Sequence, residues 1–163
     1  LMFDFNRILV PVDFSECSER ALGVAMGIAM RTDAQMYLLY VDEKPESGTW
    51  GDDAKAALQL TTLENDEACL RALADRVGGA VAEEIGLPNV ADRRLRVRIG
   101  TGDPASQIIG AANDSEADLI VMGTHGRTSL RDLFVGSTTE QVTRKASCAV
   151  LAVKPEGYPF LRD

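Results

Sequence analysis

Short apolar runs alternate with amphipathic helical patterns along this chain of 163 residues. Most of the runs are continuously apolar, as expected of parallel strands covered on both faces, and each is followed by residues with helical spacing. The alternation predicts a single α/β domain, a doubly wound sheet with right-handed crossovers. The predicted strands cover residues 7–13, 35–41, 94–99, 119–122 and 149–153. Four helices are predicted. The first is capped by Ser15 or Ser18, the second spans 63–85, the third runs from Asp103 and Pro104 to about 113–116, and the fourth spans 138–145.

Three local signals refine this picture. Pro11 cannot donate to a ladder, so the first strand should end close to it and leave Asp13 at the carboxyl edge of the sheet. The strand at 94–99 alternates arginines with aliphatic residues, which indicates one solvated face and a place at the edge of the sheet. Gly78 and Gly79 predict an interruption of the long second helix, because glycine weakens a helix interior.

The charge of the chain excludes two classes of partner. With 17 Lys and Arg against 25 Asp and Glu, the formal net charge is −8. This balance gives no overall basic footprint for nucleic acid or an anionic membrane. No apolar run approaches the roughly 18 residues of a membrane span, and the N-terminus lacks a basic-then-apolar signal layout. We therefore expect a cytoplasmic protein with no membrane insertion.

The remaining composition signals are local. Cys17, Cys69 and Cys148 are far apart and odd in number, which fits neither a disulfide framework nor a zinc site. Each is expected to be a reduced, buried, small apolar residue. Residues 42–53 predict an irregular loop whose Trp50 either covers a ligand or packs on the domain or a partner. Residues 156–163 read as a tail.

The candidate site is a glycine-rich connection between the fourth strand and the last helix. Gly123 and Gly126 follow the strand directly, and Gly136 and Ser137 come after nine further residues. Glycine permits positive φ and a close approach of ligand to backbone, while a helix that opens at Ser137 presents free N–H groups and a positive dipole end. We therefore expect a phosphate to bind here, through backbone amides.

Other phosphate-binding and catalytic motifs fit less well. The chain has no Walker G-x-x-x-x-G-K-[ST] and no G-x-S-x-G nucleophile elbow. Residues 100–105 match G-x-G-x-x-A, but they follow the predicted edge strand instead of the first strand, and Pro104 removes an amide. These glycines are interpreted as residues of a tight turn.

The single histidine does not predict a hydrolytic triad. Ser137 or Ser15 could be combined with His125 and Asp13, but nothing in the sequence orients the ring of His125 against a serine. His125 is instead expected either to be exposed or to lie near a phosphate, where it adjusts the charge of the loop near neutral pH. Arg127 likewise either meets a phosphate or is exposed.

Together, these motifs resemble the universal stress protein family. The resemblance covers nearly the whole chain, and the stretch 42–70 is its main departure. It rests on the G-x2-G-x9-G-[ST] pattern of Gly123, Gly126, Gly136 and Ser137, on the opening strand 8–13, on the segment 118–127 and on the closing strand 149–153.

The resemblance implies a Rossmann-like sheet of five parallel strands in the order 3-2-1-4-5, with a nucleotide at the switch point between strands one and four. In members with the full glycine motif the ligand is ATP, and Mg²⁺ (or Mn²⁺) offsets the phosphate charge with Asp13 nearby. By position, Pro11, Asp13 and Val41 would line the adenosine pocket and Gly123 would face the ribose. The full set of implied ligand-binding residues is Pro11, Val12, Asp13, Val41, Met122, Gly123, His125, Gly126, Arg127, Gly136, Ser137 and Thr138, of which Gly126, Gly136, Ser137 and Thr138 would meet the phosphates.

The function that the resemblance implies is nucleotide-dependent regulation in the stress response. The protein would bind ATP, pair strand 149–153 with a second copy across a two-fold axis, and offer a surface to a protein partner. Two alternatives stay open. One is a slow ATPase, since only Asp13, His125 and Arg127 could support hydrolysis. The other is a sensor of AMP or another adenylate.

Overall fold

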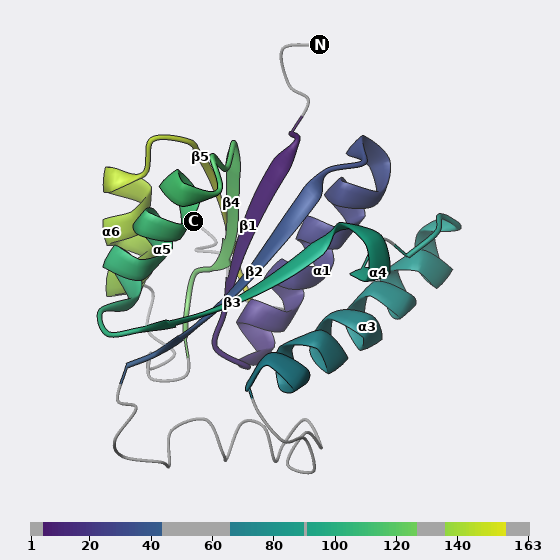
Figure 1. The fold of residues 1–163 in the computed structure, drawn as a ribbon, viewed down its shortest axis with the longest axis horizontal. Coiled ribbons are helices and arrows are strands. Elements are labelled where there is room, and N and C mark those ends of the chain that lie inside the picture. Colours follow the sequence, from purple (N-terminus) through teal and green to yellow (C-terminus); the bar gives the residue numbers. More distant parts are fainter. Residues whose placement is uncertain (1–4, 44–65, 90, 127–135, 156–163) are drawn as a thin grey trace, which may run out of the picture.

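The computed structural model describes residues 5–43, 66–89, 91–126 and 136–155. In this part of the chain strands alternate with helices, as the hydrophobic pattern predicts (Figure 1). Trp50, Arg127, the start of the predicted second helix at 63–65 and the tail 156–163 lie outside the described residues. The strands are β1 (Arg7–Val12), β2 (Gln35–Asp42), β3 (Leu95–Thr101), β4 (Leu119–Gly123) and β5 (Ala149–Val153). The helices are α1 (Glu16–Thr32), α3 (Asp66–Ile85), the short α4 (Ala91–Arg94), which the pattern did not predict, α5 (Pro104–Asp114) and α6 (Ser137–Lys145).

The sheet has the strand order β3-β2-β1-β4-β5, and every pair of neighbours is parallel. This confirms the implied order and the predicted edge position of residues 94–99. β1 pairs with β2 from Arg7 to Val12, but its register with β4 covers only Ile8 and Leu9. The missing N–H of Pro11 therefore removes no ladder bond to β4. Past Leu9 the two central strands separate at their carboxyl ends.

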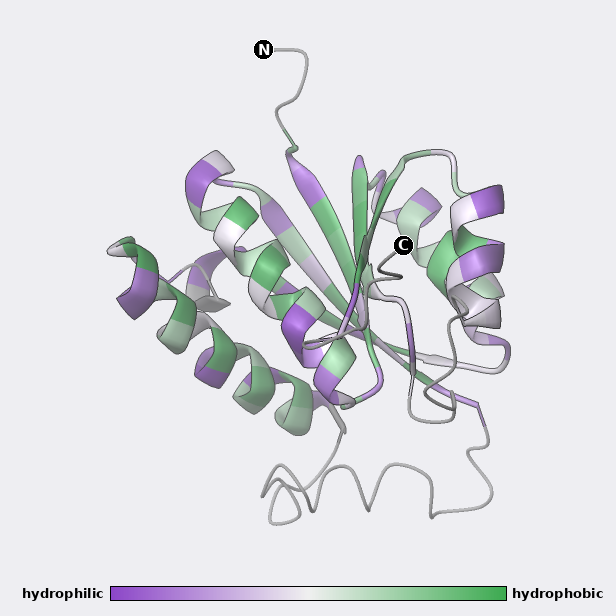
Figure 2. Ribbon diagram, turned by 180° about the vertical axis from the view of Figure 1, so that it is seen from behind, coloured by the Kyte–Doolittle hydropathy of each residue, from purple (hydrophilic) through white to green (hydrophobic). Residues whose placement is uncertain are grey.

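Helices cover both faces of the sheet, with α1 and α3 on one side and α5 and α6 on the other (Figure 1). Neighbouring residues of β1 enter different cores because side chains alternate along a strand. Ile8 and Val10 pack with α1 and α3, and Leu9 packs with α5 and α6. Figure 2 shows the result, since the strands between the two helical layers are largely apolar. The core holds the carboxyl ends of the strands in fixed positions.

The helix α3 continues through Gly78 and Gly79, so the predicted interruption is wrong. A Cβ on Gly78 would lie 2.6 Å from Oδ1 of Asn89 and 3.0 Å from Sδ of Met26 in α1. The first distance is shorter than real Cβ contacts, and the second is shorter than nine in ten of them. Glycine at this position therefore allows close packing of α3 on α1, and the packing offsets its weak helix propensity.

The predicted helix caps are present at the carboxyl edge of the sheet. Ser15 caps α1, and its Oγ accepts a hydrogen bond from the Ser18 N–H at 3.2 Å. Asp103 caps α5 by accepting from the Ser106 N–H at 2.9 Å, with Pro104 in the first helical turn. Each cap satisfies an amide that a helix start leaves without a partner. The caps thus fix the starts of α1 and α5 at the ends of β1 and β3.

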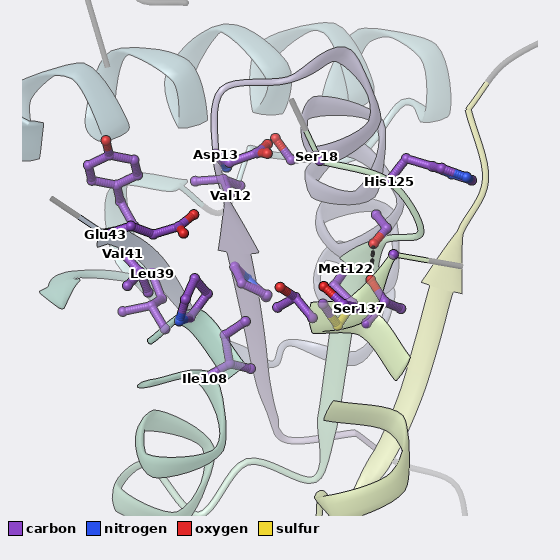
Figure 3. Close-up of a pocket in the computed structure, with 18 of the residues that line it drawn as sticks. Val12, Asp13, Ser18, Leu39, Val41, Glu43, Ile108, Met122, His125 and Ser137 are labelled. Atoms are coloured by element: carbon purple, nitrogen blue, oxygen red, sulfur yellow. Dashed lines mark hydrogen bonds between the residues drawn. The ribbon is translucent and has the colours of Figure 1, made fainter. Parts of the chain in front are cut away.

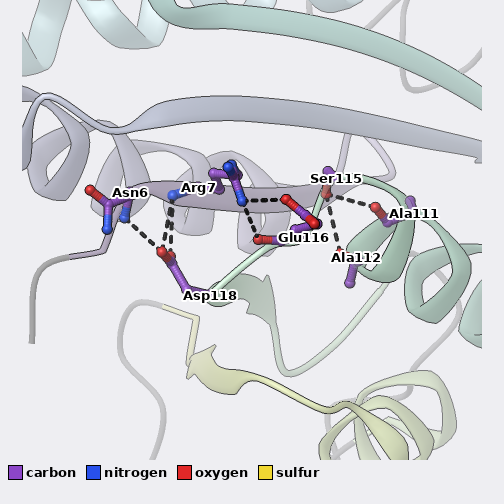
Figure 4. A network of polar contacts seen from close by, with 7 residues as sticks. All are labelled: Asn6, Arg7, Ala111, Ala112, Ser115, Glu116 and Asp118. Carbon is purple, nitrogen blue, oxygen red and sulfur yellow. Dashed lines mark hydrogen bonds and ion pairs between the residues drawn. The ribbon is translucent and has the colours of Figure 1, made fainter.

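A polar network joins the amino-terminal ends of the two central strands, β1 and β4 (Figure 4). The Asp118 carboxylate accepts hydrogen bonds from the backbone N–H of Asn6 at 2.8 Å and of Arg7 at 3.2 Å. The Asp118 N–H donates to the Arg7 carbonyl at 3.0 Å. Arg7 also pairs with Glu116 at 2.8 Å, but both side chains are exposed, and such pairs contribute little. The backbone bonds hold β1 and β4 together before they separate.

The cysteine prediction is confirmed in two positions and corrected in the third. All three are free, and Cys17 and Cys69 are buried. Cys148, the residue before β5, is only half-buried, and partial burial raises the pKa of its thiol. Within the described residues, no helix is both long and apolar enough to cross a membrane.

Candidate functional site

A pocket of about 350 Å³ opens beyond the carboxyl ends of β1, β2 and β4, where the two central strands separate (Figure 3). This volume lies in the range of small-molecule sites. Eleven of the twelve residues implied by the resemblance line it, and the twelfth, Arg127, is outside the described residues. The eleven are Pro11, Val12, Asp13, Val41, Met122, Gly123, His125, Gly126, Gly136, Ser137 and Thr138.

One end of the pocket is an apolar slot that the sequence only partly indicated. Leu39 and Val41 of β2 line it together with Pro104 and Ile108 of α5. Pro104 and Ile108 are four residues apart and so share one face of the helix. The tight turn before α5 contains Gly102 with φ 105°, and the Gly102 N–H donates to the Asp42 carbonyl at 3.0 Å. This turn brings α5 to the end of β2. Ser18, Tyr40, Asp42, Glu43 and Thr139 are further lining residues that sequence reasoning missed.

Asp13 is held in a tight turn between β1 and α1. Its Oδ1 accepts hydrogen bonds from the Ser15 N–H at 3.0 Å and from the Ser15 hydroxyl at 2.5 Å. Phe14, between them, has φ 62°, a left-handed conformation that costs a side-chain-bearing residue about 1 kcal/mol. Its buried ring packs on Tyr40 of β2 with centroids 5.2 Å apart, and this packing offsets the strain. The turn leaves the Asp13 carboxylate facing the glycine-rich connection.

A Cβ on any of the three motif glycines would make a close contact within the protein. A Cβ on Gly123 would lie 2.8 Å from Sγ of Cys17, and one on Gly126 would lie 2.8 Å from Oδ2 of Asp13. A Cβ on Gly136 would lie 3.2 Å from the Thr124 carbonyl oxygen. Among the described glycines only Gly86 and Gly102 have positive φ. The motif glycines therefore do not use the positive φ that glycine permits. Gly123 and Gly136 pass close to backbone atoms, whereas the contact of Gly126 is with the end of the Asp13 side chain.

Thr124 connects this glycine-rich segment to its surroundings. Its N–H donates to the Val153 carbonyl at 2.9 Å, and its carbonyl accepts from the Gly136 N–H at 2.8 Å. The Thr124 side chain is buried, and its Oγ1 lies 2.7 Å from Nδ1 of His125. Thr139 of α6 adds a hydrogen bond to the Gly123 carbonyl at 2.9 Å. Backbone bonds thus fix the end of β4, the end of β5 and the start of α6 relative to one another.

The helix α6 begins at Ser137, as predicted, and its start faces the pocket. The N-cap residue is Gly136, which has no side chain to bond the first amides. Ser137, Thr138 and Thr139 of the first turn all line the pocket. A helix start without a side-chain cap leaves N–H groups and the positive dipole end available to an anion.

His125 contributes to the pocket wall, but its ring points away from Asp13 and Val12 (Figure 3). The ring is oriented by the contact of its Nδ1 with Thr124. The Ser15 hydroxyl donates to Asp13. This geometry agrees with the rejection of a hydrolytic triad, which needs a base that faces both its nucleophile and its orienting carboxylate.

The charged groups of the pocket are mainly acidic. Asp13, Asp42 and Glu43 line it, and no Lys or Arg is among its described lining residues. No group of three or more His, Cys, Asp and Glu in the described part of the chain could hold a metal ion. In the described lining, an anion would be bound by backbone amides and hydroxyl groups, and a cation would need ligands from the bound molecule in addition to Asp13.

The fold and this pocket define a doubly wound α/β protein with a pocket at its switch point. The model of the universal stress protein family matches residues 4–154, and the chain belongs to this family. It is 33% identical to the universal stress protein MJ0531 of Methanocaldococcus jannaschii over 92% of this chain and 82% of that protein.

Two solved structures illustrate the similarity. The universal stress protein UspA of Lactobacillus plantarum is 31% identical, with a TM-score of 0.66 over 91% of this chain and 97% of the other. A universal stress protein solved in complex with cAMP is 22% identical, with a TM-score of 0.63 over 94% and 99% of the two chains. At this lower identity the second similarity shows the fold alone.

The contact of Gly123 with Cys17 predicts a stability difference between two glycines. Gly123→Ala should lower the free energy of unfolding by about 1–3 kcal/mol, because the added methyl overlaps Sγ and the backbone of Cys17. Gly110→Ala is the control, since Gly110 is an exposed residue of α5 with no atom within 4 Å of an added Cβ. That change should stabilise by about 0.5–1 kcal/mol. Urea denaturation measures both, and equal effects would contradict the packing explanation.

Proposed function

We propose that this protein binds an adenine nucleotide, with ATP as the leading candidate. It acts in the stress response as a regulator whose nucleotide state changes the surface that it presents to a protein partner. The observation that carries the proposal is the pocket at the switch point. It has an apolar slot at one end and, at the other, a glycine-rich backbone next to the start of α6. These two ends suit a base and a phosphate respectively.

The apolar end supports a flat base. Pro11, Leu39, Val41 and Ile108 would bury the faces of a ring, which is favourable because apolar surface leaves water. β2 also offers a polar backbone group there. The Asp42 carbonyl points to β3, where it accepts from Gly102. Successive carbonyls of a strand point to opposite sides, so the Val41 carbonyl points to the β1 side, past the last β1–β2 pair at Val12 and Tyr40. An amino group on the edge of the base could donate to it.

The other end supports phosphate. Gly126 and Gly136 expose backbone without a side chain, and Ser137 and Thr138 add hydroxyl donors at the start of α6. One protein of the same fold was solved in complex with cAMP, so this fold can bind an adenine nucleotide, and the number of phosphates stays open for this chain. The pocket favours binding over turnover, because its described lining has no Lys or Arg to stabilise a transferring phosphoryl group.

Nucleotide binding should depend on Gly126 and Gly136. Gly126→Val together with Gly136→Val should weaken ATP binding at least tenfold by calorimetry, because the branched side chains fill the phosphate end, a cost of about 1.4 kcal/mol or more. Both side chains also approach Asp13 and Thr124, so circular dichroism must show that the variant is folded. Wild-type affinity in a folded variant would contradict the site. Mass spectrometry of the nucleotide released on denaturing the purified protein distinguishes ATP from AMP.

A magnesium or manganese ion should be held by the phosphates with Asp13 nearby. Asp13→Ala should therefore weaken Mg-ATP more than ATP in chelator. Because Asp13 also bonds Ser15, Asp13→Asn is the better probe, since the amide oxygen can still accept those bonds while the charge is lost. It should show the same unequal loss with less effect on stability. If the affinity for ATP falls equally with and without Mg²⁺, Asp13 does not lie near the metal.

The protein should form a homodimer in which the edge strand β5 pairs with β5 of a second copy across a two-fold axis. β5 is the last strand of the sheet, and Ala149, Leu151 and Ala152 are exposed on it. Leu151→Asp should convert the dimer to a monomer in sedimentation velocity, because a carboxylate would be desolvated at the interface. Val24→Asp is the control, since Val24 of α1 is 37% exposed and Leu151 is 38% exposed. A dimer that survives Leu151→Asp would place the interface elsewhere.

A further inference from the structure

Glu43 gives the apolar end of the pocket a charged group that the family motif does not include. It follows β2 directly, and its carboxylate turns toward the middle of the pocket near Val41 and Leu39 (Figure 3). Ile108 and Pro104 line the same end from α5. A ligand that enters the slot edge-on would therefore meet a carboxylate beside an apolar surface.

Two hydrogen-bonding groups at this end, the Val41 carbonyl and the Glu43 carboxylate, are acceptors. The Val41 carbonyl points to the β1 side of β2, and the Glu43 carboxylate lies two residues further along the same chain. An ionised carboxylate only accepts, and so does a carbonyl. An exocyclic amino group has two N–H donors and can satisfy both acceptors, whereas a keto oxygen in the same place would face two acceptors without a proton. The slot is thus matched to an amino-bearing edge of a base.

We propose that Glu43 is a specificity-determining residue, which accepts a hydrogen bond from the 6-amino group of adenine and so discriminates adenine from 6-oxopurine nucleotides. The inference rests on the proposed nucleotide site and goes further, because it assigns the choice of base to one side chain. A 6-oxopurine is rejected because its keto oxygen, an acceptor, would face the Glu43 carboxylate, which is also an acceptor.

Because Glu43 is charged, the direction in which its removal changes the affinity for ATP tests its role. Asp13, Asp42 and Glu43 all repel a polyphosphate, so removal of a carboxylate that makes no hydrogen bond should strengthen the binding of every nucleotide triphosphate. Removal of a carboxylate that accepts from the base should weaken ATP alone. The two roles therefore predict opposite changes for ATP.

The experiment is calorimetry of ATP and ITP, each with Mg²⁺, on the full chain and on Glu43→Ala, Glu43→Gln and Glu83→Ala. ITP carries an oxygen where ATP carries the amino group. Wild type should prefer ATP, and Glu43→Ala should weaken ATP about three- to tenfold while ITP is unchanged or binds more tightly. Glu43→Gln keeps an acceptor oxygen and should retain part of the preference. Glu83→Ala is the control, since Glu83 is an exposed residue of α3 outside the pocket.

Each other outcome overturns the inference. Equal weakening of ATP and ITP would assign Glu43 to the ribose or to local structure, and tighter ATP binding in Glu43→Ala would leave it only a repulsive charge. If wild type binds both nucleotides equally well, the base is not selected at position 6. If wild type binds no ATP, the proposed function itself fails, and this result is distinct from the others because it needs no variant.

Discussion

The backbone hydrogen bonds of Thr124 are the contacts on which the site depends. The carbonyl of Thr124 accepts from Gly136, and its N–H donates to Val153, so the two ends of the β4–α6 connection are held together next to the end of β5. Because Thr124 is buried, loss of either bond would leave an unsatisfied polar group, which typically costs about 1–3 kcal/mol. The start of α6 is therefore fixed at the pocket by the main chain, independently of the side chains that a ligand would contact.

The same bonds hold the connection close to the rest of the protein at three glycines. The connection passes close to the start of α1 at Gly123, close to Asp13 at Gly126 and close to its own beginning at Gly136. The Val153 carbonyl accepts from both Thr124 and the Cys17 thiol, the latter at 3.3 Å. One acceptor at the end of the edge strand thus joins the glycine-rich segment to α1. The site and the exposed edge of the sheet share this structural element.

The sequence was sufficient for the elements whose signals are local. Hydrophobic periodicity located the strands, alternation placed 94–99 at the edge, and cap residues located the starts of α1 and α5. The strand order came from the resemblance, because no local signal states which strands are neighbours. Periodicity also missed what depends on contacts through space. Gly78 weakens an isolated helix but allows α3 to pack on α1, and Phe14 adopts a left-handed φ because its ring packs on Tyr40.

For the candidate site, the glycines could be predicted from the sequence, whereas the close contacts that they make are seen only in the structure. Residues on both sides of the slot, Leu39 and Ile108, belong to segments that only the folded sheet brings together. Their types carry no chemical signal, since leucine and isoleucine are ordinary core residues. Glu43 was equally inconspicuous in a polar stretch of an acidic chain.

The acidity of the pocket decides how a nucleotide could be held there. In a chain of net charge −8, a phosphate site built from lysines would need a strong local excess of positive charge, which the described lining does not have. Backbone amides and a helix start supply only partial positive charge, but their direction is fixed before the ligand arrives. A site of this kind would bind through preorganised geometry, and its described lining has no mobile cationic groups that could stabilise phosphoryl transfer. Because the described lining offers no Lys or Arg, a nucleotide bound as we propose would be hydrolysed slowly, and a protein that keeps its nucleotide intact is suited to report on it.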